Sequence, residues 1–147
     1  MEFILNKDLV NILETEDIDF EELRKTVDKI RHLSLELDKT TTNFITSRKI
    51  NTAFEKLLHN YEDLSLVKNI KKVFKILNPL HLNLDVWKAQ TIYFRIGKKH
   101  YPLVKEKAEK GDENAREWIE CFENLGKYLN IGGITDVHPG SDVQASV

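Results

Sequence analysis

Two glutamate–histidine pairs have the residue types and spacing that come nearest to a metal-binding motif. Glu55 and His59 are four residues apart, as are His32 and Glu36, so each pair could meet on one helix face and hold a metal ion. Neither pair has the further ligands that a metal site needs, and no Glu-x-x-His motif of a di-iron bundle occurs. We interpret both as solvated surface pairs and expect no metal and no cofactor.

Residues able to act as nucleophiles or as acid–base pairs are equally sparse. The only cysteine, Cys121, stands beside Phe122 in an apolar stretch, so we interpret it as an inert buried thiol. Gly132-Gly133 follow a helical pattern and not a strand, which argues against a phosphate-binding loop. The acidic residues stand at cap positions and on polar helix faces, and no two of them form a recognisable pair for glycoside hydrolysis. The sequence therefore predicts no catalytic residue.

The elements that position these residues are predicted to be helices. Only 6 glycines and 3 prolines occur in 147 residues, which favours long helices over many turns, so we predict an all-α fold. We expect a bundle of five or six helices in a single domain over residues 1–131, followed by a disordered tail over 132–147. Apolar residues recur at helical spacing in the segments 20–37, 50–61, 66–77, 84–96 and 115–129, and in the shorter segments 1–15 and 103–110.

Local signals mark several helix ends. Asp19, with Glu22 three residues later, resembles a capping box, and Asp63 or Ser65 suits the start of a later helix. Gly111 suits the left-handed position after a helix, and the following Asp112 suits the next N-cap. Cap-type and β-branched residues cluster at 38–43, where we predict a break, although a long helix through 38–49 remains the alternative.

Residues 84–96 form a helical pattern that is apolar on two adjacent stripes. Such a helix must be covered over most of its circumference, so we predict that it lies at the centre of the bundle. Trp87 is then a core residue, as is Trp118 in the last helix. The first stripe consists of Leu84, Trp87, Thr91 and Phe94, and the second consists of Val86, Gln90 and Tyr93.

Gln90 is the polar residue that needs explanation in this apolar helix. A buried amide without a partner costs free energy, so we expect Gln90 to bond a backbone carbonyl or a helix end. In the functional alternative, Gln90 is a polar anchor in a sugar-binding or domain-docking groove, where Trp87 or Tyr93 stacks against the ligand. The core interpretation is simpler for Trp87 and Trp118 because both stand at core spacing.

The net charge of −2 conceals three blocks of unequal charge. Residues 1–67 carry 9 Lys/Arg against 14 Asp/Glu, residues 68–110 carry 11 against 3, and residues 111–147 carry 2 against 7. The simpler interpretation is that the packed helices neutralise one another. The alternative is a basic face for an anionic partner.

The remaining features narrow the class of partner and the compartment. Lys68, Lys71, Lys72 and Lys75 form a stripe typical of a solvated helix face, without the arginines and interleaved aromatics of a nucleic-acid site. No membrane span and no signal peptide are recognisable. A single cysteine fits a reducing compartment. We expect a cytoplasmic protein that binds neither nucleic acid nor membrane.

Two spaced motifs within residues 80–131 resemble a known family. They are the helix Leu84–Phe94 and the run Gly111–Ile119, followed by Phe122, Leu125-Gly126 and Leu129. Together they resemble the C-terminal helical region of bacterial and archaeal proteins related to family 57 glycoside hydrolases. Thr91 departs from that pattern, in which Asn is expected. The matching positions are Trp87, Ala89, Gln90, Tyr93, Phe94, Trp118 and Leu125-Gly126.

The resemblance implies a non-catalytic accessory module, because the family's catalytic residues lie in an N-terminal barrel that this sequence does not contain. Such a module packs on or supports the catalytic domain of a glycoside hydrolase or glucanotransferase. An α-glucan is a possible ligand. The alternative function is a free-standing adaptor that binds another protein through its basic middle segment. The residues implied for docking or sugar contact are Trp87, Gln90, Tyr93, Phe94 and Trp118.

Overall fold

The computed structural model describes residues 2–129, which form an all-α bundle without β-strands, as predicted. Residues 2–129 form seven α-helices where five or six were expected, because the two short segments fold as separate helices. The predicted tail over 132–147 lies outside the described residues. The helices are α1 (Glu2–Glu14), α2 (Phe20–His32), α3 (Lys39–His59), α4 (Leu64–Leu77), α5 (Trp87–Lys99), α6 (Tyr101–Glu109) and α7 (Glu113–Tyr128), with a 3₁₀ turn η1 (Asn78–Leu80) after α4.

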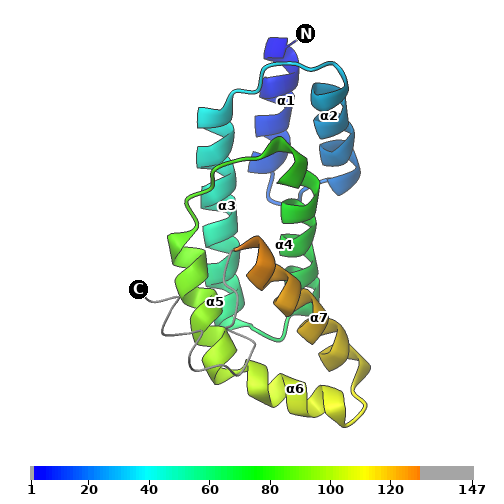
Figure 1. The fold of residues 1–147 in the computed structure, drawn as a ribbon, viewed down its shortest axis with the longest axis vertical. Helices are drawn as coiled ribbons and strands as arrows, with labels where there is room; N and C mark the ends of the chain where they lie inside the picture. The colour runs from blue at the N-terminus through cyan, green and yellow to red at the C-terminus, as the bar shows by residue number, and fades with distance from the viewer. Residues whose placement is uncertain (1, 130–147) are drawn as a thin grey trace.

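The bundle is elongated, with α3 and α4 running along its long axis (Figure 1). The α1–α2 hairpin packs on these two helices at one end. At the other end α5 packs on α3, α6 crosses the end of the molecule, and α7 returns along α4. One hydrophobic core contains residues from all seven helices.

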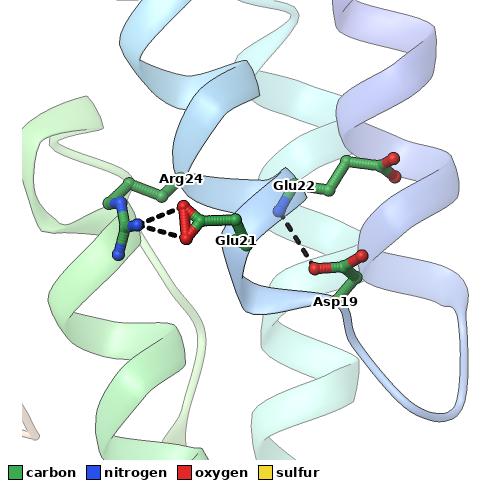
Figure 2. Close-up of polar contacts among 4 residues, drawn as sticks. All are labelled: Asp19, Glu21, Glu22 and Arg24. Carbon is green, nitrogen blue, oxygen red and sulfur yellow. Dashed lines mark hydrogen bonds and ion pairs between the residues drawn. The ribbon is translucent and has the colours of Figure 1, made fainter.

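Aspartate side chains fix four helix starts. Asp19, Asp63 and Asp112 accept hydrogen bonds from the backbone N–H groups three residues later, so these predicted caps are confirmed. Figure 2 shows the Asp19 cap beside the ion pair between Arg24 and Glu21. The cap that starts α3 is Asp38, which accepts from Thr41 N at 3.2 Å.

The prediction that the second helix continues to Leu37 is wrong. Helix α2 ends at His32, and the chain reverses with Ser34 at a φ of 51°. The N–H groups of Ser34 and Leu35 donate to Arg31 O and Ile30 O, which is the Schellman pattern. The cap-type residues at 38–43 therefore begin a helix, and the break lies a few residues earlier than predicted.

Helix α5 is not covered over most of its circumference, so that prediction is also wrong. The predicted first stripe faces solvent from Trp87 onward: Trp87 is 71% exposed, and Thr91 and Phe94 are exposed as well. The face that packs contains the second stripe, because Val86 and Tyr93 are buried. The helix begins at Trp87, three residues later than expected.

Candidate docking surface on helix α5

The inner face of α5 joins an aromatic cluster in the core. Tyr93 stacks on Phe122 with ring centroids 4.1 Å apart, and Trp118 stacks on the same ring at 4.7 Å. The Tyr93 hydroxyl donates to Phe122 O at 2.8 Å, and Trp118 Nε1 donates to Tyr61 O at 2.6 Å. Burial raises the pKa of the Tyr93 hydroxyl. Tyr93 and the 2%-exposed Trp118 are thus packing residues, out of reach of a ligand.

Gln90 lies at the edge of this inner face and has the structural role that was expected. Its side chain is half-buried, and Nε2 donates to Leu129 O at 2.7 Å. Leu129 caps the C-terminal end of α7, where carbonyl groups lack partners within the helix. Gln90 therefore ties the end of α7 to α5.

The outer face of α5 exposes two large aromatic side chains among cations. Trp87 stands at its start and the 40%-exposed Phe94 stands two turns later. Arg95 and Lys98 are exposed on the same side, and Lys98 Nζ lies 5.0 Å from the centroid of the Phe94 ring. The helix contains no acidic residue. We call Trp87, Thr91, Phe94, Arg95, Lys98 and Lys99 the α5 outer face.

Three polar side chains of α3 hold the chain that leads into α5. Asn43 Oδ1 accepts from Asn83 N at 3.1 Å, and Ser47 Oγ accepts from Asp85 N at 2.9 Å. The third, Asn51, spans the junction: Oδ1 accepts from Ala89 N at 3.0 Å, and Nδ2 donates to Asp85 O at 3.1 Å. We call Asn43, Ser47 and Asn51 the α3 ladder.

The α3 ladder replaces the missing cap of α5. Val86, the N-cap residue, makes no side-chain capping bond, so an amide from a neighbouring helix satisfies the first-turn donor of Ala89. The backbone on both sides of Trp87 is fixed while its indole remains in solvent. Sequence analysis missed these residues, although small polar side chains at a spacing of four on one helix were a readable signal.

Two shallow hollows flank Trp87 between α3 and α5. One has a volume of about 540 Å³ and includes Phe44, Arg48 and Asp85 in its lining. The other, of about 330 Å³, includes Leu58, His59 and Arg95. Because Trp87 lines both, a partner could place side chains on either side of the indole.

The basic block, residues 68–110, contains some cations that form ion pairs and others that do not. Lys88 bonds Glu55 at 2.8 Å and Lys107 bonds Glu62 at 3.0 Å, and Lys68 pairs with Glu117. Each carboxylate comes from one of the two acidic blocks, which agrees with neutralisation between packed helices. By contrast, three cations of the α5 outer face have no ion-pair partner among residues 2–129. They are Arg95, Lys98 and Lys99.

The other sites that the sequence suggested offer no chemistry. Glu55 binds Lys88 instead of pairing with His59 in a metal site, and Glu36 lies beyond the end of α2, off any helix shared with His32. No cluster suited to a metal ion occurs in the described range. Burial raises the pKa of the Cys121 thiol and so favours its unreactive form.

A separate cavity of about 430 Å³ lies where the end of α7 meets the connector between α4 and α5. Its lining mixes Phe74 and Leu77 with His81, Gln90 and Lys127. Because apolar, basic and amide side chains line the cavity together, the lining does not favour one class of ligand. The α5 outer face is therefore the better candidate site.

Comparison with known proteins adds no relative. No protein-family model, curated protein or solved structure matches this chain. None of the described helices has the length and apolar character needed to cross a membrane.

Proposed function

We propose that this chain is a non-catalytic helical module that docks on another protein through the α5 outer face. The observation that carries the proposal is Trp87, which is 71% exposed although its flanking backbone is fixed by the α3 ladder. A large aromatic side chain on rigid backbone loses little entropy on binding, and tryptophan is enriched among residues that dominate binding energy.

The resemblance to the family 57 glycoside hydrolase-like proteins suggests the partner. We propose that the module packs on the carbohydrate-active catalytic domain of such a protein. Trp87 and Phe94, both at motif positions, are the proposed anchors, and Gln90 acts indirectly by holding the end of α7. Tyr93 and Trp118 support the fold beneath the face.

A free-standing adaptor is the second candidate function. The observation that favours it is the set of unpaired cations Arg95, Lys98 and Lys99, which suits an anionic protein of any family. Both candidates use the same face, and they differ in the partner that binds there.

The test is calorimetric titration of the chain with a family 57 glycoside hydrolase-like catalytic domain from the same genome. We expect saturable binding that a Trp87→Ala/Phe94→Ala variant weakens about 30-fold or more, the size of a typical hot-spot loss. The matched control is Phe3→Ala, because Phe3 is 77% exposed on α1 at the other end of the molecule.

Two results would contradict the proposal. Equal losses in the control and the double variant would show that the α5 outer face is not the docking surface. Absence of binding to the catalytic domain would remove the accessory role and leave the adaptor. A parallel titration with maltoheptaose, monitored by tryptophan fluorescence, separates sugar binding from protein docking, because Trp87 is the exposed one of the two tryptophans.

A further inference from the structure

The α5 outer face combines cations with exposed aromatic side chains, whereas helix α4, which is equally free of acidic residues, exposes no aromatic ring. Over its 13 residues α5 contains cations and no acidic side chain. Acidic residues elsewhere neutralise Lys68, Lys88 and Lys107, but not Arg95, Lys98 or Lys99. Cations in the last turn complement the helix dipole, which accounts for Lys98 and Lys99. Arg95 lies a turn earlier, beside the Trp87 hollow, where that explanation does not apply.

The size of the face limits what it can bind. Trp87 and Lys98 are 11 residues apart along the helix, which corresponds to about 16 Å. Within that length the face offers aromatic anchors and cations together. A short peptide segment or a few turns of a helix would cover it.

The surroundings argue against a nucleic acid as the occupant. The other basic stripe, Lys68–Lys75, lies on α4, on the opposite side of α3 from α5 (Figure 1). The regions before and after the basic block are both acidic, with five more carboxylates than cations in each. The cations of α4 and α5 therefore form two separate stripes on different helices and not one continuous basic track for a polyanion.

We infer that the partner binds the α5 outer face with a short acidic segment that carries a large apolar side chain. Its carboxylates pair with Arg95, Lys98 and Lys99, and its apolar side chain packs in a hollow beside Trp87. This inference rests on the proposed docking function and specifies the chemistry of the contacting segment.

The experiment is selection of a random peptide library on the full chain, with counter-selection on the Trp87→Ala variant. We expect the enriched peptides to be net negative and to contain aromatic or leucine side chains. The best peptide is then titrated against two matched variants that each lose three cations. Arg95→Gln/Lys98→Gln/Lys99→Gln should weaken binding about tenfold, since each exposed charge pair contributes about 0.2–1 kcal/mol. Lys71→Gln/Lys72→Gln/Lys75→Gln should leave binding unchanged.

Neutral or basic enriched peptides would overturn the inference, as would equal losses in the two triple variants. Tighter binding of oligothymidine than of the best peptide would assign the face to single-stranded nucleic acid instead. If enriched peptides are uncharged while Trp87→Ala/Phe94→Ala still abolishes docking on the catalytic domain, the proposed function stands and only this inference fails. Added salt should weaken acidic-peptide binding, because the pairs are exposed.

Discussion

The two tryptophans of this chain occupy opposite environments, although each stands on a helix. Trp118 projects from α7 into the core, stacks on Phe122 and donates its indole N–H to Tyr61 O. Trp87 projects from the first turn of α5 into solvent between two hollows. Both stand in apolar stripes of helical period, so the stripe alone does not determine which face is buried.

The difference follows from what each helix meets. Helix α7 packs on both α4 and α6, and its single apolar stripe has a covering surface. Helix α5 packs mainly on α3 and α6, and this contact covers one of its two apolar stripes. The uncovered stripe leaves Trp87 and Phe94 exposed, and aromatic residues are enriched at protein–protein interfaces.

The largest expected contrast is between the two alanine variants. Trp118→Ala should destabilise the protein by about 3–5 kcal/mol, because it removes a buried aromatic ring and leaves a cavity. Trp87→Ala should change the free energy of unfolding by about 0.5 kcal/mol or less, as for other surface substitutions. Urea unfolding followed by circular dichroism measures both. Comparable losses would mean that Trp87 is buried in solution.

A smaller effect is expected where the α3 ladder holds the start of α5. Asn51→Ala should cost about 1–2 kcal/mol, because the Ala89 N–H loses its cap and Asp85 O loses a donor. The same variant should loosen the backbone around Trp87. Hydrogen exchange of residues 85–89 should accelerate in Asn51→Ala, with Thr52→Ala as the control from the same helix. Unchanged exchange would show that the ladder does not fix this segment.

Among the substitutions that remove packing or a hydrogen bond, the smallest loss of stability at neutral pH is expected beneath the face, at Tyr93. Tyr93→Phe removes the bond to Phe122 O and should cost about 1 kcal/mol. Burial raises the folded-state pKa of Tyr93, whereas an unfolded tyrosine ionises near pH 10. The stabilisation is therefore complete below about pH 10 and is lost as the pH rises above it. Urea unfolding on either side of that pH should show that the free energy of unfolding falls less steeply with pH in Tyr93→Phe than in the unmodified protein. Equal falls would contradict a contribution from the buried Tyr93 hydroxyl.

Helix ends were predictable where the signal lies within a few residues. Asp19, Asp63 and Asp112 are caps in the structure because the bond they make is local. Two Schellman motifs, one after α2 and one after α6, show which helix ends a local pattern does not mark. Gly111 was recognised because glycine favours a positive φ, whereas Ser34 adopts the same region without a glycine to mark it.

The candidate site was less predictable because it depends on contacts between distant segments. The structural role of Gln90 was foreseen, since a buried amide needs a partner, but Leu129 as that partner was not. The exposure of Trp87 depends on which side of α5 meets α3. The side chains of the α3 ladder bond backbone groups that lie 34 to 40 positions further along the chain, and no local pattern specifies such a pairing.

The α3 ladder also bears on how this chain can change in length during evolution. From Asn43 to Ser47 the helix advances four residues, about 6 Å, while the bonded backbone advances from Asn83 to Asp85, two residues of about 3.3 Å each if extended. The spacing of the bonding side chains along α3 thus matches the spacing of the backbone groups that they bond. Inserting or deleting one residue within 83–86 would offset every later bond and rotate α5 about its axis. This connector should therefore resist length variation that surface loops ordinarily accept.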